Sequence, residues 1–339
     1  MNLKIKNIDL KAFIFNRLIE VFAIGLFLLA ILLSLAVVTY TPDDPNFIFS
    51  EGQKVKNLLG INGSIVSDFF FQSITLIGVG LIGSSIARAV KKRRDLVQTV
   101  TLTYVKAEVR QKAKRIGLGD HVLDNVSVAV KDADCVILCT PIGNYAEIMQ
   151  NISNHLKPGC IVSDVGSVKR APIADMSPHI PDGVHFVPGH PIAGTEQSGP
   201  ESGFAELFEG RYWLLTPNPE TERSAIKRMR SLFEGIGAMV EEMDPDYHDK
   251  VLAITSHLPH LIAYTIVGTA DDLEDQTQAD VIRFSASGFR DFTRIAGSNP
   301  IMWRDIFLNN REAVLEMLQR FTEDLTVLQR AIRWGEAQT

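Results

Sequence analysis

Two short segments of the chain carry residue types suited to the oxidation of an alcohol. One is the run His190-Pro-Ile-Ala-Gly-Thr-Glu196, whose imidazole can take a hydroxyl proton while a hydride leaves the same carbon. The other, upstream, is Gly78-Val-Gly-Leu-Ile-Gly83, whose glycine spacing is typical of a turn that holds a dinucleotide. Together the two segments indicate a dehydrogenase that uses a nicotinamide cofactor.

The glycine run lies between a predicted strand, Ser73–Ile77, and a predicted helix, Ser84–Val90. In such a turn the first glycine allows a tight bend, the second lets the pyrophosphate approach, and the third lets the helix pack close to the strand. The N-terminus of the helix then faces the phosphates. We therefore expect cofactor contacts from the turn and from two later strand ends: Gly78, Val79, Gly80, Leu81, Ile82, Gly83, Lys106, Thr140 and Pro141.

The end of the second predicted strand, Thr99–Tyr104, bears on the choice of cofactor. A site that prefers NAD usually has Asp or Glu there to bind the ribose 2′-hydroxyl. This chain has Val105 and Lys106 instead, with Glu108 late and Arg110 beyond it. The two cations could accept the 2′-phosphate of NADP, or they could be the solvated start of a helix, so NAD and NADP both remain open.

Strands and helices alternate through the first two thirds of the catalytic region. The chain shows strand patterns at Asp134–Thr140, Cys160–Asp164 and His185–Pro188, with a helix near Tyr145–His155 between the first two. Such alternation predicts an α/β Rossmann-type, doubly wound parallel sheet that collects ligands at the carboxyl ends of its strands. We expect Trp213–Pro217 and Ala238–Met243 to complete that sheet.

Three loops at these strand ends carry the candidate chemistry, including Asp164-Val-Gly-Ser-Val-Lys169. We expect His190 in such a loop, stiffened by Pro191, with Ser167 hydrogen-bonding its other ring nitrogen and fixing the tautomer. From Asp244 onward the strand signals fade, and apolar residues spaced by three and four predict one long amphipathic helix over Trp303–Trp334. The expected organisation is an N-terminal segment 1–72, a dinucleotide-binding domain 73–243 and an all-α domain 244–339.

Composition narrows the range of functions. A formal charge of −6 and a pI near 5.8 argue against a nucleic-acid partner. The three cysteines are few, and Cys135 and Cys139 lie in an apolar strand pattern, which favours a core role. His257 and His260 suggest a metal pair, but Leu-Pro separates them and no third ligand is evident, so we expect no metal.

An uncharged apolar run, residues 21–40, precedes the catalytic region. As a helix it would span about 30 Å, the thickness of a bilayer core, which predicts a transmembrane helix rather than a signal peptide, since no cleavage pattern follows. Positively charged residues flank the cytoplasmic end of most membrane helices, and here they precede the run, at Lys4, Lys6, Lys11 and Arg17. We therefore expect the N-terminus in the cytoplasm. Tyr40-Thr-Pro-Asp-Asp-Pro-Asn46 and Asn57-Leu-Leu-Gly60 resemble the first membrane segment of FtsK/SpoIIIE-type DNA translocases, although the motor's phosphate-binding loop is absent from the sequence.

These two predictions conflict. One crossing would put the dinucleotide domain outside the cytoplasm, and a second would have to use 69–90, which is the predicted cofactor-binding strand and helix. We therefore interpret residues 1–72 as a fusion, genomic or an assembly artefact, joined to a cytoplasmic catalytic chain. The protein would be membrane-associated, through 21–40, only if residues 1–72 are genuinely expressed.

From Ser73 onward the chain resembles the prephenate/arogenate (cyclohexadienyl) dehydrogenase family. The matching segments are Gly78–Ser84, Asp164–Lys169, Gly189–Glu196, Thr255-Ser-His-Leu-Pro-His260, Phe289-Arg-Asp-Phe-Thr-Arg-Ile-Ala296 and Pro300-Ile-Met-Trp-Arg-Asp305. The resemblance implies NAD(P)-dependent oxidative decarboxylation of prephenate or arogenate in tyrosine biosynthesis, with loss of CO2 and aromatisation. It also implies a homodimer built by the helical domain.

The resemblance assigns roles to individual residues. His190 polarises the substrate hydroxyl and Ser167 tunes His190, so both are catalytic candidates. The substrate-binding candidates are the carboxylate clamp Arg294, then His257, Glu196, Ser298 and Trp303. Two alternatives stay open: a membrane-anchored fusion protein whose dehydrogenase domain is inert, and another Rossmann-type hydroxyacid dehydrogenase, which would not explain the histidine segment.

Overall fold

The computed structural model describes residues 10–39, 55–64, 73–273 and 275–336. The chain divides into two compact parts, Met1–Phe71 and Gln72–Thr339. Each is described by itself.

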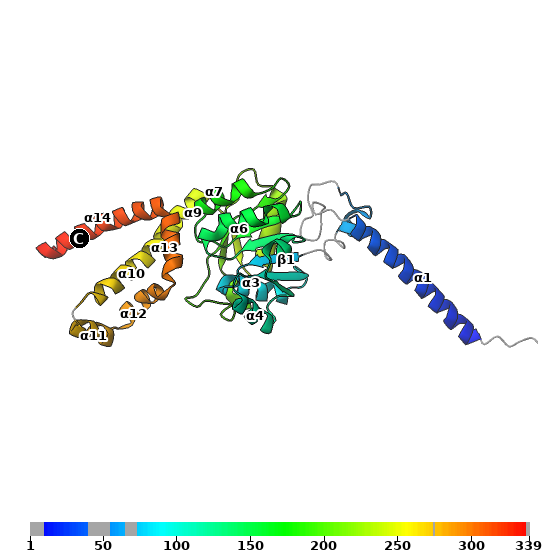
Figure 1. Cartoon of the computed structure of the whole chain (residues 1–339), viewed down its shortest axis with the longest axis horizontal. Coiled ribbons are helices and arrows are strands. Elements are labelled where there is room, and N and C mark those ends of the chain that lie inside the picture. The colour runs from blue at the N-terminus through cyan, green and yellow to red at the C-terminus, as the bar shows by residue number, and fades with distance from the viewer. Residues whose placement is uncertain (1–9, 40–54, 65–72, 274, 337–339) are drawn as a thin grey trace, which may run out of the picture. The chain divides into compact units, whose positions relative to one another are not determined.

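The N-terminal part is dominated by one helix, α1 (Leu10–Val38) (Figure 1). Its span Arg17–Val38 is 22 residues long with a mean hydropathy of 3.0, and only 6% of its most apolar stretch is buried. The side-chain amide of Asn57 donates to the carbonyls of Ala36 and Thr39, at 2.9 and 3.2 Å. Asn57 therefore caps the C-terminal end of a helix that is otherwise covered in exposed apolar side chains.

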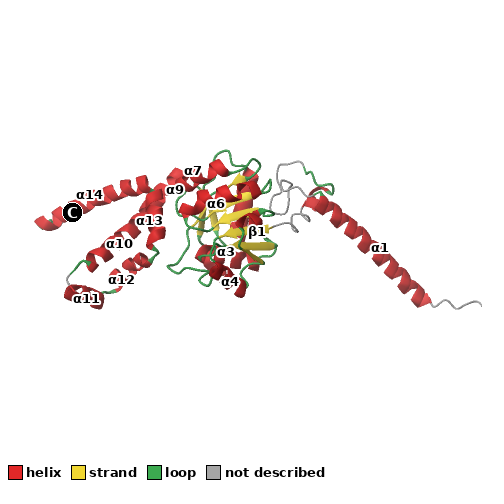
Figure 2. Cartoon of the chain, viewed as in Figure 1, coloured by secondary structure: helices red, strands yellow, loops and turns green. Residues whose placement is uncertain are grey.

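The main part contains a six-stranded parallel sheet in the order β3-β2-β1-β4-β5-β6 (Figures 1 and 2). Its strands are β1 (Ser73–Ile77), β2 (Thr99–Thr103), β3 (His121–Leu123), β4 (Cys135–Leu138), β5 (Ile161–Asp164) and β6 (His185–Phe186). The helices that connect and cover them are α3 (Leu81–Lys92), α4 (Ala107–Arg115), α5 (Val126–Val130), α6 (Tyr145–Ile152) and α7 (Arg170–Met176). This is the doubly wound parallel sheet that the sequence predicts.

Both faces of the sheet are buried because successive side chains of a strand point in opposite directions. Leu76 belongs to a core cluster shared with α3, whereas its neighbour Ile77 belongs to a second cluster shared with α6. In β4, Ile137 and Leu138 divide between the same two clusters. Strands covered on both faces read as continuous apolar runs, which explains why their positions were visible in the sequence.

The strands expected to complete this sheet form a separate one. β7 (Gly189–Pro191), β8 (Tyr212–Leu215) and β9 (Met239–Glu242) make a three-stranded sheet in that order, beside α8 (Arg223–Gly235). β7 pairs antiparallel with β8, so His190 lies opposite Leu214. Two predictions were therefore wrong: β8 and β9 do not extend the parallel sheet, and His190 stands within a short strand instead of a loop.

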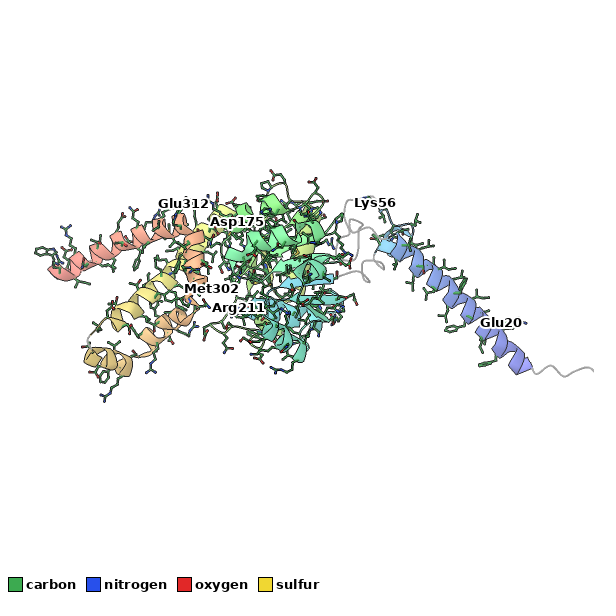
Figure 3. All side chains as sticks on the ribbon, in the orientation of Figure 1. Glu20, Lys56, Asp175, Arg211, Met302 and Glu312 are labelled. Atoms are coloured by element: carbon green, nitrogen blue, oxygen red, sulfur yellow. The ribbon has the colours of Figure 1, made fainter. Side chains whose placement is uncertain are left out.

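The helical domain consists of α9 (Pro245–Leu252), a π-helical turn Ala253–His257, and α10 (Leu258–Asp271), α11 (Asp275–Phe284), α12 (Ser287–Thr293), α13 (Pro300–Asn309) and α14 (Arg311–Trp334). The long helix expected over Trp303–Trp334 is broken at Asn310, between α13 and α14. Arg170 of α7 pairs with Asp246 and Glu312, at 2.8 and 3.4 Å, and so ties α7 to α9 and α14; Glu312 is marked at the start of α14 in Figure 3.

Candidate active site

The glycine turn after β1 has the geometry that a dinucleotide needs. Gly78 adopts φ +107°, and a Cβ there would lie 2.6 Å from the Cys139 carbonyl oxygen. At Gly83 a Cβ would lie 2.2 Å from the carbonyl oxygen of Gly78, so only glycine lets α3 pack this close. At Gly80, by contrast, a Cβ would meet nothing within 4 Å. The turn therefore leaves open space at its middle glycine alone, where a pyrophosphate would approach.

The start of α3 offers donors to that space. Gly80 is the N-cap residue of α3 and provides no side-chain cap, so the first backbone N–H groups of the helix are available to an anion. Val79 and Leu81 are buried in the core, which leaves only their main chains for contact. At the end of the neighbouring strand β4, the buried hydroxyl of Thr140 forms no hydrogen bond with any residue that the structure describes. These features fit a dinucleotide along the carboxyl edge of the sheet.

The end of β2 carries no carboxylate at residues 104–106. Lys106 is exposed and is the N-cap residue of α4. Arg110 is occupied locally, because its Nη1 donates to the carbonyl oxygens of Tyr104 and Val105, both at 2.6 Å. The guanidinium therefore stabilises the strand-end loop, which is a role that the sequence did not indicate.

His190 is held by a neighbour from the helical domain. Its Nδ1 lies 2.9 Å from Nε2 of His248 on α9, and His248 Nδ1 lies 2.8 Å from Oδ1 of Asp249. Burial, with further contributions from His248, Lys169 and His257, lowers the pKa of His190 well below its ordinary value. The imidazole is therefore neutral at physiological pH, in the form that accepts a proton.

Ser167 does not hold His190 in this structure. The ring nitrogen that we expected Ser167 to hold is bonded to His248, and within the described ranges no hydrogen bond joins Ser167 to His190. The reason is spatial: α9 packs against α7 and brings Nε2 of His248 to within 2.9 Å of His190 Nδ1. Ser167 itself is half-buried in the loop after β5.

An ion pair with no exposed surface supports the strand of His190 from behind. Lys169 Nζ lies 2.6 Å from Asp164 Oδ2 and 2.6 Å from the Gly189 carbonyl oxygen. The second carboxylate oxygen of Asp164 accepts from the Gly189 N–H at 3.2 Å. Asp164 and Lys169 thus hold both main-chain polar groups of the residue that precedes His190.

His257 and Trp303 lie together in the helical domain. Asn310 Nδ2 lies 3.0 Å from Nδ1 of His257, which makes that ring nitrogen an acceptor and leaves a proton on Nε2. That Nε2 is buried and, among the residues that the structure describes, meets no partner with full hydrogen-bond geometry, although the main chain of Ser167 lies close to the ring. Burial lowers the pKa of His257 to about 4. His260 stacks on Trp303, with ring centroids 3.6 Å apart.

The remaining substrate-binding candidates lie nearer the surface. Arg294 Nη1 lies 3.3 Å from Glu196 Oε2, and both side chains are largely exposed. Ser298 accepts a hydrogen bond from the Tyr264 hydroxyl through its carbonyl oxygen, at 2.8 Å. Among the described residues, no group of three or more His, Cys, Asp and Glu side chains is arranged to hold a metal ion.

Sequence reasoning missed three site residues: His248, Asp249 and Asn310. The adjacent pair His248-Asp249, just inside a helix that begins after Asp244, was the one signal available. Nothing local connects it to His190, because the two histidines are 58 residues apart in the sequence.

Comparisons with known proteins point to one enzyme family. Family models of the prephenate dehydrogenase nucleotide-binding domain and dimerization domain match residues 86–242 and 244–339. The cyclohexadienyl dehydrogenase of Zymomonas mobilis is 43% identical over 77% of this chain and 89% of its own length. The prephenate dehydrogenase of Bacillus subtilis is 33% identical over 78% of this chain and 71% of its own.

A solved structure is similar in fold. The prephenate dehydrogenase from A. aeolicus, in complex with hydroxyphenyl propionate and NAD+, has a TM-score of 0.72 and 34% identity and covers 79% of this chain and 93% of its own. A third family model, the 4TM region of DNA translocase FtsK/SpoIIIE, matches residues 16–94. That match includes β1 and α3, but β1 pairs with β2 and β4, which lie beyond residue 94, and α3 packs on the same sheet, so residues 73–92 belong to the dehydrogenase fold.

Proposed function

The chain belongs to the prephenate dehydrogenase family, and on that premise we propose that it oxidatively decarboxylates prephenate or arogenate with a nicotinamide dinucleotide. The observation that carries the proposal is the neutral, buried His190, which β7 holds beside the carboxyl end of β5, in the same six-stranded sheet that carries the open glycine turn after β1. The open glycine turn and the neutral His190 also argue against the alternative of a dehydrogenase domain that is inert. Another Rossmann-type hydroxyacid dehydrogenase would not explain the hydrogen-bonded pair of His190 and His248.

In the proposed reaction His190 Nε2 accepts the hydrogen bond of the ring hydroxyl. The C–H bond at the hydroxyl-bearing carbon breaks with its electron pair, and the bound nicotinamide supplies the acceptor for that hydride. The ring carboxylate leaves as CO2, and its bonding electrons complete the aromatic ring. The proton that His190 shares during hydride transfer returns to the phenolic oxygen, so no net proton is released. His190 therefore acts by accepting the hydroxyl proton at Nε2 and returning it to the same oxygen.

Arg294 is proposed to bind a substrate carboxylate. A guanidinium forms paired, charge-assisted hydrogen bonds with a carboxylate, and the pair Arg294–Glu196 shows that a carboxylate already fits there. Because that pair is exposed and 3.3 Å long, it is weak, and a substrate carboxylate can displace Glu196. Trp303, His257 and Ser298 are proposed to line the same site.

The cofactor is proposed to be NAD or NADP. Residues 104–106 carry no carboxylate to repel a 2′-phosphate, and exposed Lys106 lies at the start of α4. We expect NADP to bind at least as well as NAD, with Lys106→Glu weakening NADP selectively. Ser167, Thr140 and Pro141 are proposed to line the nicotinamide end of the site.

A second copy of the chain is the proposed partner of the helical domain. The match to a dimerization domain supports a homodimer, and α14 exposes the large apolar side chains Leu315, Leu325, Leu328 and Ile332. An open groove on the same helix is lined by Leu315, Leu318, Gln319, Thr322, Glu323 and Thr326. Burying such a face against a partner is favourable because apolar area leaves water.

The N-terminal part is proposed to associate with a membrane where it is expressed. At about 1.5 Å per residue the 22-residue span Arg17–Val38 is about 33 Å long, enough to cross the hydrocarbon core. A second apolar stretch, Pro245–Asp271, belongs to the helical domain and is 28% buried. The domain division 1–72, 73–243 and 244–339 remains our proposal, as does the interpretation of 1–72 as a fusion. Sequencing reads that cross codon 72, and cell fractionation of the expressed chain, test that interpretation.

The function is tested with the purified full chain in detergent. Formation of reduced nicotinamide is followed while prephenate and arogenate are each combined with NAD and NADP, and the Ser73–Thr339 fragment is assayed beside it. Turnover in any combination supports the proposal and identifies substrate and cofactor. A folded chain that binds cofactor but turns over neither substrate would contradict it.

A further inference from the structure

The side chains behind His190 form a chain of two short contacts. His190 Nδ1 lies 2.9 Å from His248 Nε2, and His248 Nδ1 lies 2.8 Å from Asp249 Oδ1. His248 and Asp249 are fully buried, and His190 is 8% exposed. The two imidazole rings are inclined by 64°, so their nitrogens meet edge to edge. His248 and Asp249 both lie on α9 of the helical domain, whereas His190 lies on β7 of the dinucleotide-binding domain.

Asp249 determines the direction of these hydrogen bonds. Its Oδ1 accepts from the Lys169 N–H at 2.8 Å, and its Oδ2 accepts from the Arg170 N–H at 3.0 Å. A carboxylate that only accepts satisfies both main-chain donors and a third donor from His248. His248 must therefore carry its proton on Nδ1. In the neutral ring, Nε2 of His248 then carries a lone pair and can only accept a hydrogen bond.

The same reasoning extends to the base. A lone pair on His248 Nε2 requires a proton on His190 Nδ1, so the lone pair of His190 lies on Nε2. That nitrogen makes no hydrogen bond to the described residues. Burial lowers the pKa of both histidines, which keeps both rings neutral in the free enzyme. The other titratable groups that face the pair are Lys169, Asp164 and His257, of which His257 is neutral.

We propose that His248 and Asp249 are positioning residues that fix His190 as its Nδ1–H tautomer, so that Nε2 is the atom that receives the substrate hydroxyl's hydrogen. The inference rests on the proposed function for its kinetic consequence, but the tautomer itself is a property of the free protein. When the hydroxyl proton moves to Nε2, the positive charge of His190 is shared through Nδ1–H with His248 and faces the Asp249 carboxylate. The proton then returns to the product oxygen, and no further reactant is needed.

The arrangement also couples the base to the packing of the two domains. Asp249 binds the main chain at the start of α7 with the same carboxylate that orients His248. A shift of α9 would therefore change both the domain contact and the tautomer. The second domain thus supplies the orientation of a base that the first domain carries.

The direct test is a spectroscopic measurement on the full chain in detergent micelles with 15N-labelled histidine. The nitrogen shifts distinguish a protonated ring nitrogen from a lone pair, and the His190→Asn variant assigns the signals of His190. We expect His190 with its proton on Nδ1 and His248 likewise. A proton on Nε2 of His190 in the free protein would overturn the proposal, whatever substrate the enzyme uses.

Two variants of His248 supply the kinetic test. His248→Gln offers a carbonyl oxygen close to the position of Nε2 and can still accept from His190, whereas His248→Leu removes the acceptor at similar volume. We expect His248→Leu to lower kcat by about 10²-fold, the lower end of what a positioned acid or base contributes, while cofactor Kd is unchanged. His248→Gln is expected to restore most of kcat. Equal kcat in wild type and His248→Leu would overturn the proposal.

The two levels of failure are distinguishable. If wild type turns over neither prephenate nor arogenate, the proposed function fails, while the nitrogen shifts still report the tautomer. If wild type is active and His248→Gln behaves like His248→Leu, with the same loss of kcat, the role of His248 is not to accept a hydrogen bond and the inference fails. If His248→Leu does not fold, the spectrum of the wild-type chain decides.

Discussion

Lys169 and Asp164 form an ion pair that has no exposed surface, with Nζ and Oδ2 2.6 Å apart, directly behind the strand of His190. Burial lowers the pKa of Lys169, and the neighbouring Asp164 carboxylate opposes that change. The pair is satisfied because Lys169 also donates to the Gly189 carbonyl and Asp164 accepts from two main-chain N–H groups, of Gly166 and Gly189. Its position makes it a support for β7, the strand that carries His190.

Removing Lys169 should be costly. In Lys169→Met the Asp164 carboxylate stays buried without its cation, and we expect the free energy of unfolding to fall by about 3–5 kcal/mol. Urea unfolding followed by circular dichroism measures the change. The matched control is Lys92→Met, which breaks the exposed Lys92–Glu206 pair and should cost about 0–1 kcal/mol. Equal losses in the two variants would show that the buried pair does not stabilise this strand.

The glycine turn allows fold and cofactor binding to be separated. Gly83→Ala would place a Cβ 2.2 Å from the Gly78 carbonyl, so we expect a loss of about 1–3 kcal/mol in stability. Gly80→Ala meets nothing within 4 Å, so the free protein should keep its Tm while cofactor binding weakens. Thermal unfolding and fluorescence titration with NADH and NADPH measure the two effects. A Gly80→Ala variant that binds cofactor normally would place the pyrophosphate elsewhere.

His190 is the residue on which the proposed chemistry depends. His190→Asn should lower kcat by roughly 10²–10⁴-fold, because the hydroxyl loses its proton acceptor, and cofactor binding should change little. Steady-state kinetics and cofactor titration measure both quantities. The control is His179→Asn, at a half-buried histidine whose Nε2 contacts the side chain of Gln150, and it should leave kcat unchanged. An unchanged kcat in His190→Asn would remove that residue from the mechanism.

Arg294 should affect substrate binding more than cofactor binding. Arg294→Gln is expected to weaken substrate binding by about 1.5–3 kcal/mol, the range for a hydrogen bond to a charged group. Glu196→Gln is the matched partner variant. It removes the carboxylate that competes with the substrate for Arg294 but keeps the guanidinium, so its KM for the substrate should not rise. If KM is normal in Arg294→Gln, another group holds the substrate carboxylate.

The buried histidines should make the protein sensitive to acid. Burial lowers the pKa of His257 from 6.5 to about 4, so between these values the unfolded chain binds more protons than the folded chain. Stability is therefore complete above about pH 6.5 and is lost as pH falls toward 4, by about 3 kcal/mol for this group. The pKa values of His190 and His248 are also lowered, which adds in the same direction.

Urea midpoints at a series of pH values measure this loss. His257→Gln should flatten the pH dependence of the urea midpoint. The control is His155→Gln, at an exposed position just after the end of α6, and it should leave that dependence unchanged. A wild-type midpoint that is constant between pH 7 and pH 5 would contradict the buried neutral state of these rings.

The sequence by itself determined the parallel sheet and the glycine turn, because both depend on residues close together in the chain. Apolar runs fully buried on two faces, and glycines at Gly78, Gly80 and Gly83, specify strand, turn and helix over about twenty residues. The uncharged apolar run and two different family resemblances set residues 1–72 apart from residues 73 onward, and that division stays a prediction.

Only the tertiary structure decided what surrounds the base. The partner of His190 comes from a position 58 residues away, and that of His257 from 53 residues away. Local patterns placed His190 in a loop, because a three-residue strand is too short to show alternation, and its pairing with β8 exists only once the chain has folded. Likewise Asn310 interrupts a continuous helical pattern so that its amide can reach His257 and the carbonyl of Asp249. Buried polar groups must find partners wherever the fold brings them, and no local pattern records that choice.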